Sequence, residues 1–173
     1  MASNLRGSFC MGCIRAYMVA NTTLIWENVS DGITDEIASY NFGIQWKNYG
    51  MTPARRCHSR TSLMVFDGVM PDDFEYTDKA APTITETNHF GPGQGYNSKV
   101  GGLSISDAIA VERGEKHVYV WSWIEYDDIF GRARRRTEVC FHLLFGKDRK
   151  TCTPAVSGPL NGADEDCHHQ TKT

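Results

Sequence analysis

Long apolar runs are missing from this sequence. The 173-residue chain contains no stretch near the roughly 18 consecutive apolar residues that a membrane-spanning helix needs, so we expect no transmembrane segment. Its start, MASNLRGSFCMGC, also lacks the run of about seven apolar residues that a secretory signal requires. The net charge is only -3, which gives the whole molecule no attraction to nucleic acid or to an anionic membrane. The sequence therefore predicts a soluble chain without a nucleic-acid partner.

The motifs of common enzymes are missing as well. The chain has no GxSxG nucleophile elbow and no HExxH zinc-protease motif. The glycine-dense segment at residues 90–95, FGPGQG, lacks the lysine and hydroxyl residue of a phosphate-binding loop, so it is predicted to be a turn. Neighbours on a strand point to opposite faces, so neither Cys57 with His58 nor Asp127 with Asp128 forms a catalytic pair. We predict that Cys57 is a small buried residue and expect no enzyme activity and no cofactor.

Cysteine is present, but its spacing does not describe a compact zinc module. The chain has six cysteines, of which two form a CxxC pair near its start. The candidate metal ligands are Cys10, Cys13, Cys152, Cys167, His168 and His169. Structural zinc sites place their ligand pairs on tight turns of one compact unit, whereas these candidates are separated by most of the sequence. We therefore predict no metal site and keep a zinc-dependent module only as a third hypothesis.

The most informative pattern in the sequence is a two-residue periodicity. Apolar residues alternate through residues 36–47, which predicts a half-buried strand, and this strand ends where glycine and proline follow. The predicted strands cover residues 14–26, 36–47, 60–66, 100–105, 117–126 and 134–145. Residues 72–87 are expected to form a loop or a helical turn. Helix formers at residues 106–113, preceded by a cap and followed by Gly114, predict one short helix.

This number and spacing of strands favour a β-sandwich. About seven short strands separated by turn signals suit two packed antiparallel sheets better than a helical or βαβ plan. The side chains expected in its core are Phe42, Ile44, Trp46, Val118, Val120, Ile124, Val139 and Phe141.

Residues 117–145 are predicted to form a hairpin with an aromatic outer face. Tyr119, Trp121 and Trp123 fall on the face opposite the core residues. Arg134 and Arg136, at alternating positions of the returning strand, are expected to lie across from these rings and to cover them through cation–π contacts and their aliphatic stems. The alternative is that the same five residues bind a sugar or a nucleotide, because aromatic platforms flanked by arginine do so in other proteins.

Several short segments give the chain a resemblance to a known group. RAY at residues 15–17, KNYGMTPA at 47–54, FGPG at 90–93 and YDDIFG at 126–131 followed by RTE occur in an order that resembles a family of uncharacterised, membrane-anchored proteobacterial proteins. The resemblance implies an immunoglobulin-like β-sandwich, placed after an N-terminal membrane helix, with no assigned enzyme activity. In this sequence residues 1–13 stand where the anchor is expected. The domain is therefore expected on the periplasmic side of the cell envelope if an anchor belongs with it, where a Cys152–Cys167 disulfide would be permitted, and otherwise in the cytoplasm.

The expected organisation is an N-terminal extension at residues 1–13, a sandwich domain at residues 14–146 and a flexible tail at residues 147–173. The first functional hypothesis is a non-enzymatic interaction or accessory domain that binds a protein partner through a sheet edge or the aromatic face. The alternative is a small-ligand or carbohydrate-binding module built on the aromatic and arginine residues. The sequence specifies neither the partner nor the oligomeric state.

Overall fold

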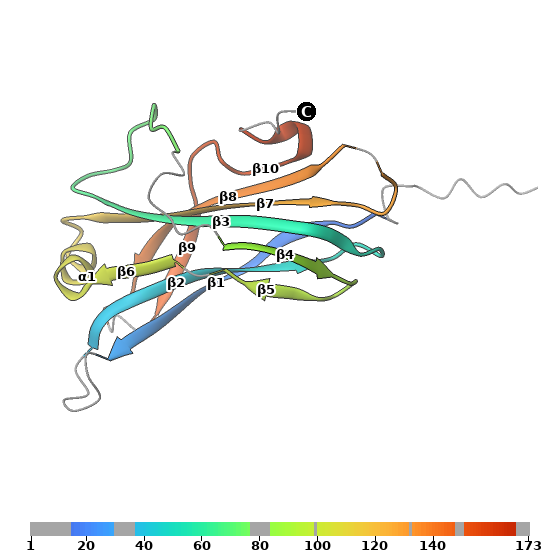
Figure 1. The fold of residues 1–173 in the computed structure, drawn as a ribbon. Helices are drawn as coiled ribbons and strands as arrows, with labels where there is room; N and C mark the ends of the chain where they lie inside the picture. The colour runs from blue at the N-terminus through green and yellow to red at the C-terminus, as the bar shows by residue number, and fades with distance from the viewer. Residues whose placement is uncertain are drawn as a thin grey trace, which may run out of the picture.

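The chain forms two antiparallel β-sheets that face each other across a hydrophobic core (Figure 1). The structure is a computed structural model that describes residues 15–29, 37–76, 84–98, 100–131, 133–147 and 151–168. Sheet A contains β1 (Met18–Val29), β2 (Ile37–Asn48), β5 (Gly95–Asn97) and β6 (Val100–Ser104). Sheet B contains, in order, β10 (Gly162–Ala163), β8 (Arg135–Phe145), β7 (His117–Asp127), β3 (Ala54–Phe66) and β4 (Ile84–Phe90), and β9 (Cys152–Val156) also pairs with β8. The prediction of a mostly-β sandwich is confirmed.

The long strands lie where the two-residue periodicity places them. β2 and β7 match the predicted segments to within one residue at each end, and β8 begins one residue later than predicted. β1 pairs with β2 from Met18, opposite Asn48, to Val29, opposite Ile37. Strands of this length are predictable because every second side chain must be buried in the same core.

The described residues form ten strands instead of about seven. β4 lies partly in the segment expected to be a loop. β3 begins at Ala54, six residues before the predicted start at residue 60. A bulge near Arg56 interrupts the two-residue alternation there, so the sequence pattern does not show the first part of this strand. The sequence analysis places residues 147–173 in a tail, whereas β9 and β10 pair with β8 and extend sheet B.

One short α-helix lies at one end of the sandwich (Figure 1). α1 spans Ile105–Glu112, one residue earlier than predicted. Its N-cap is Ser104, whose hydroxyl accepts a hydrogen bond from the Asp107 amide at 3.1 Å, as N-cap serines do. Gly114 follows with a positive φ of 74°, the conformation that commonly ends a helix. Among the described residues, no helix is long and apolar enough to cross a membrane.

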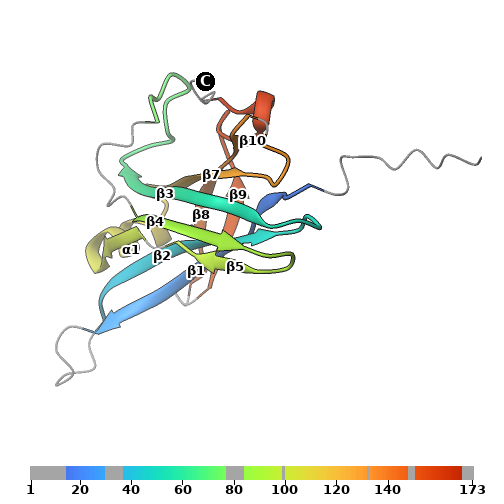
Figure 2. The ribbon, with the colours of Figure 1, turned by 45° about the vertical axis from the view of Figure 1, so that its right-hand side comes forward.

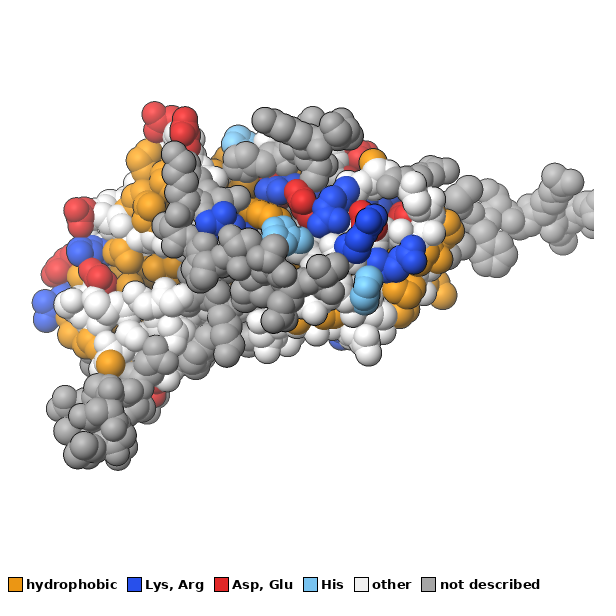
Figure 3. All heavy atoms as spheres, in the orientation of Figure 1, with side chains coloured by type: hydrophobic (Ala, Val, Ile, Leu, Met, Phe, Trp, Pro, Cys, Tyr) orange, Lys and Arg blue, Asp and Glu red, His pale blue; other side chains and the backbone are white. Residues whose placement is uncertain are grey.

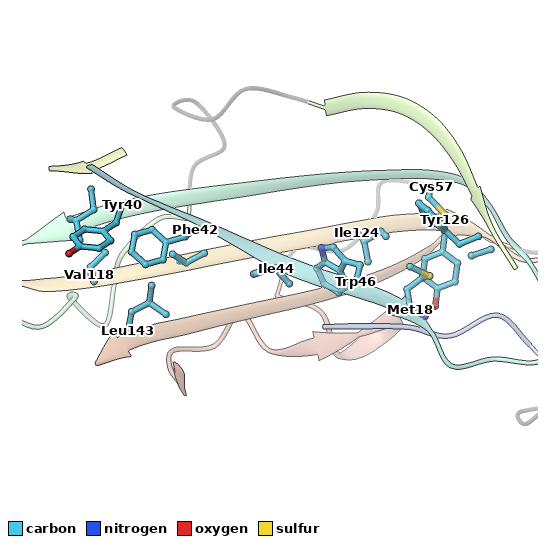
Figure 4. Close-up of a cluster of buried hydrophobic side chains, with 14 of the residues drawn as sticks. Met18, Tyr40, Phe42, Ile44, Trp46, Cys57, Val118, Ile124, Tyr126 and Leu143 are labelled. Atoms are coloured by element: carbon cyan, nitrogen blue, oxygen red, sulfur yellow. Dashed lines mark hydrogen bonds between the residues drawn. The ribbon is translucent and has the colours of Figure 1, made fainter. Parts of the chain in front are cut away.

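Alternate side chains of β2, β7 and β8 meet between the sheets (Figure 4). Six of the eight predicted core residues are buried and the other two, Val139 and Phe141, are partly buried against them. Ile44 and Trp46 are fully enclosed. Truncating one such large side chain to alanine lowers the free energy of unfolding by about 2–5 kcal/mol. Burial of these side chains therefore determines which face of each strand points toward the core.

A chain of hydroxyl groups crosses the core from one sheet to the other. Thr61 of β3 lies 2.8 Å from the hydroxyl of Ser122 on β7 and donates to the hydroxyl of Ser98 at 2.8 Å. Ser98 in turn accepts a hydrogen bond from the Ile44 amide of β2 at 3.1 Å. Buried polar groups need partners, and here the partners belong to different sheets. These bonds therefore fix how sheet A and sheet B are positioned along each other.

Candidate functional site

Tyr119, Trp121 and Trp123 of β7 point away from the core between the sheets, but other parts of the chain cover them. Tyr119 and Trp121 are each 2% exposed, and Trp123 is 9% exposed. Phe74 and Tyr76, from the segment after β3, contact the Trp121 ring edge to face, with ring centroids 5.6 and 5.8 Å away. In Figures 1 and 2 this segment and the C-terminal segment both lie over the outer side of sheet B. Sugar and base stacking needs an open ring face, and these rings do not offer one.

The predicted cover by arginine holds for one ring only. The Arg136 guanidinium lies 4.5 Å from the centre of the Trp123 ring, as the sequence predicts. However, the register sets Arg136 opposite Glu125, and Arg134 lies beyond the rings, where it binds Glu125 at 3.1 Å. The prediction that both arginines lie across from all three aromatic residues is therefore wrong.

The candidate zinc ligands do not meet in the described part of the chain. Cys10, Cys13 and His169 lie outside the described residues. Cys152 pairs with Phe145 at one end of β8, whereas the Cys167 thiol contacts the Arg136 carbonyl near the other end, about 30 Å away at the rise of a strand. Both thiols are free, which makes the Cys152–Cys167 disulfide prediction wrong. His168 packs its ring against Tyr76, and no group of three possible ligands occurs among the described residues.

The end of the sandwich opposite α1 is formed by the start of one strand and by several turns. We call it the loop end: it comprises the start of β1 and the turns that join β2 to β3, β4 to β5 and β7 to β8 (Figure 1). The segments at residues 15–17, 47–54, 90–93 and 126–131 lie here, although they are far apart in sequence. Three of them meet at the fully buried side chain of Asn48.

Asn48 holds three of these segments together with four hydrogen bonds. Its amide nitrogen donates to the carbonyl oxygens of Thr52, at 2.8 Å, and Phe90, at 3.0 Å. Its side-chain oxygen accepts from the backbone amides of Tyr17, at 3.1 Å, and Gly50, at 2.9 Å. One side chain thus satisfies four backbone groups in a buried position, which is the full capacity of an amide with two donors and one oxygen acceptor.

The β7–β8 turn is tied to the same point by Asp128. Its carboxylate accepts a hydrogen bond from the Phe130 amide at 2.8 Å and lies 3.9 Å from the Arg15 guanidinium. Arg15 also lies over the Phe130 ring, 5.9 Å from its centre. Gly50 packs so closely on the adjoining backbone that a Cβ there would overlap the Arg15 carbonyl oxygen. The loops at this end therefore support one another.

This end exposes large apolar side chains to solvent. Five of the eight exposed large hydrophobic residues among those described lie on its loops. We call this set the apolar tip: Tyr17, Tyr49, Met51, Ile129 and Phe130. The exposed fractions range from 44% for both β7–β8 residues to 70% for the methionine. Clusters of this kind mark interaction surfaces more often than single exposed residues do.

Arginine and carboxylate side chains form a network beside the apolar tip. Figure 3 shows arginine side chains gathered with histidine on this half of the sheet B face, and hydrophobic side chains at the adjoining right-hand end. The arginines are Arg15, Arg55, Arg56, Arg134, Arg135 and Arg136. The carboxylates are Glu125, Asp127, Asp128, Glu138 and Asp164. Each carboxylate has at least one arginine within ion-pair distance.

Neither Asn48 nor the apolar tip stands out as a candidate site in the sequence alone. A single asparagine two residues before a glycine looks like an ordinary turn residue, and exposed apolar residues in loops carry no periodicity. The available signal was the recurrence of short polar and glycine motifs in separate turns, whose convergence only the fold reveals.

Comparison of the chain with protein-family models, curated proteins and solved structures gives no match. The interpretation of the loop end therefore depends on its geometry.

Proposed function

We propose that this chain is a non-enzymatic protein-binding domain that holds its partner at the loop end. The observation that carries the proposal is the apolar tip, because most of the exposed large hydrophobic side chains of the described residues gather on loops that a buried network holds in place. We also assign the domain to the immunoglobulin-like class. The neighbouring positions of β3 and β7, two strands far apart in sequence, support this assignment, since such long-range pairing is typical of Greek-key sandwiches.

Preorganisation of the loops supports a binding role. A partner that docks on rigid loops loses less conformational entropy on binding than one that must first order them. Asn48 fixes the β2–β3 and β4–β5 turns, and Asp128 fixes the β7–β8 turn. The apolar tip thus presents a surface whose shape exists before the partner arrives.

The described thiols support a role without covalent chemistry. Burial raises the pKa of Cys57 and Cys140 to about 12, and that of Cys152 to about 11. Thiols with such values are protonated at neutral pH, and the protonated form is a weak nucleophile. Tyr119, Trp121 and Trp123 are covered, so the apolar tip is also a better binding surface than the aromatic face, which the sequence offered as one alternative.

The proposal is tested by crosslinking from defined positions. A photoreactive benzoyl-phenylalanine is placed at Tyr49 or Phe130, and for comparison at Val69 or Val156, which are 73% and 71% exposed away from the loop end. In cells that naturally express the chain, the two loop-end positions should crosslink the same protein, and the two control positions should not. The protein is identified by mass spectrometry and purified.

Binding of the purified partner then measures the contribution of the tip. The double substitution Ile129→Ser with Phe130→Ser should weaken binding at least about tenfold, because truncated aromatic anchors at interfaces commonly cost 2 kcal/mol or more. Val69→Ser is the matched control and should leave the affinity unchanged. Equal crosslinking from all four positions, or unchanged affinity of the double variant, would refute a binding site at the loop end.

A further inference from the structure

A pocket of about 430 Å³ opens on the loop end next to the apolar tip. Its lining residues are Arg55, Arg56, His89, Asp127, Asp128 and Gly131. They come from the start of β3, the end of β4 and the β7–β8 turn. The pocket is therefore built by the same elements that carry the proposed binding surface.

A bulge in β3 brings two arginines to this pocket. Arg55 pairs with Asp127 of β7 and His58 pairs with Glu125, so that two residues of β3 lie opposite the single residue Tyr126. Within the bulge Arg56 has a positive φ of 49°, a conformation that costs an ordinary residue on the order of 1 kcal/mol. In a regular strand Arg55 and Arg56 would point to opposite faces. The bulge instead leaves both exposed on the rim of one pocket, and bulges that redirect side chains in this way are frequent next to binding sites.

The two arginines and two aspartates that line the pocket balance in formal charge, but both aspartates are already paired with arginines other than Arg55. Asp127 already pairs with Arg56 and, at 3.4 Å, with Arg134. Asp128 lies 3.4 Å from Arg135. Among the described residues no carboxylate lies within ion-pair distance of Arg55. Arg55 is therefore the guanidinium on the pocket rim that no described carboxylate pairs with.

His89 stands on the same rim. It is exposed at the end of β4 and lines the pocket with the two arginines. An imidazole ring N–H is a further donor to an oxyanion. Arginine presents a planar fork of N–H groups that matches the two oxygens of a carboxylate, and such charge-assisted pairs are stronger than neutral hydrogen bonds.

We propose that this pocket binds an oxyanion and that its natural source is a carboxylate side chain in an acidic segment of the partner that docks on the apolar tip. This inference rests on the proposed function, because it assigns the partner's chemistry at the same end of the molecule. Arg55 is the principal contact, and Arg56, already oriented by Asp127, adds its remaining N–H groups. The partner segment is predicted to combine acidic residues for the pocket with apolar residues for the tip.

The proposal is tested with defined probes on the full chain at low ionic strength. The probes are the capped peptide Ac-ELDFE-amide, its neutral counterpart Ac-QLNFQ-amide, and inorganic phosphate, each titrated while amide chemical shifts are followed by NMR. The acidic peptide should bind more tightly than the neutral peptide and should shift the Arg55 and His89 amides. Added salt should reduce its affinity more than that of the neutral peptide, since screening acts on charges.

Three variants separate a specific site from general charge attraction. Arg55→Gln should weaken binding of the acidic peptide about tenfold, equivalent to about 1.4 kcal/mol, and Arg55→Lys should restore only part of it because lysine lacks the fork. Arg113→Gln removes the same charge from an exposed position beside α1, at the far end of the molecule, and should change affinity less than about twofold. Retained amide dispersion shows that each variant folds.

Each result decides the question. Equal weakening by Arg55→Gln and Arg113→Gln, or equal affinity for the acidic and neutral peptides, would overturn the oxyanion site. Phosphate that binds more tightly than the acidic peptide and displaces it would overturn the partner carboxylate as the source and identify a free anion instead. If the crosslinked partner binds Arg55→Gln as well as it binds the unaltered chain, the proposed function stands and the pocket assignment fails. If the peptide binds but no partner crosslinks at the tip, the oxyanion site stands, whereas the proposed function and the partner carboxylate as the source of the oxyanion both fail.

Discussion

Replacing Asn48 with alanine is predicted to destabilise the whole domain, although the residue belongs to a loop junction and not to the apolar core. The Asn48 side chain is fully buried and makes four hydrogen bonds to backbone groups of three separate segments. A hydrogen bond contributes about 0.5–1.5 kcal/mol net, and a buried backbone group left without a partner costs about 1–3 kcal/mol. Allowing for partial replacement by water, the substitution should lower the free energy of unfolding by about 4 kcal/mol, a large share of the 5–15 kcal/mol typical of a domain.

Urea unfolding followed by intrinsic tryptophan fluorescence measures this loss. The midpoint should fall while the slope with urea concentration stays constant, which shows that stability has changed and not the extent of unfolding. Asn97→Ala is the matched control, since Asn97 is exposed and makes one side-chain hydrogen bond, to Gln45 at 3.2 Å; it should cost less than about 0.5 kcal/mol. A loss below about 1 kcal/mol for Asn48→Ala would refute the view that this side chain organises the loop end.

Three further predictions concern the rest of the sandwich. Thr61→Val, which removes the central hydroxyl between the sheets, should lower the unfolding free energy by about 1–3 kcal/mol, measured in the same assay; no loss would show that the hydroxyl chain is dispensable. Burial, and secondarily His117, lowers the pKa of His142, so the unfolded chain binds more protons and stability should fall as the pH drops below about 6.5. His142→Gln should make urea midpoints less dependent on pH between 7.5 and 5.5, and an unchanged dependence would contradict the assignment. Non-reducing peptide mapping of the oxidised protein should find Cys152 and Cys167 unlinked to each other, because they lie near opposite ends of β8.

The fold could be predicted from the sequence wherever the two-residue alternation of buried and exposed side chains continued over many residues. β2 and β7 alternate along their whole length, so their position and inward face follow from the pattern. β3 was shortened in the prediction because the bulge at Arg56 interrupts its alternation. β9 was missed because its five residues, CTPAV, include a proline, which argues against a strand except at an edge, and an edge is where it lies.

The proposed binding surface was less predictable because its parts are distant in sequence. Tyr119 and Trp121 look exposed from the alternation of β7, yet the side chains that cover them, Phe74, Tyr76 and Leu160, come from loops that carry no periodic signal. The loop end is the converse case. Its residues look like turn formers one by one, and only the meeting of several turns around Asn48 makes them one surface.

The two halves of the sheet B outer face explain why only one of them is covered by loops. Toward α1 the outward residues of β3 and β7 are aromatic, and burying them requires loops such as the one that carries Phe74. Toward the loop end the outward residues are charged, and the Arg136 guanidinium lies over the Trp123 ring while it remains paired with Glu125 at 2.8 Å. In this charged half the long side chains themselves cover the apolar surface of the sheet, so no loop is needed to cover it. The chain can therefore leave the arginine pocket and the adjoining apolar tip open without exposing its core, which is the condition that a stable binding surface must meet.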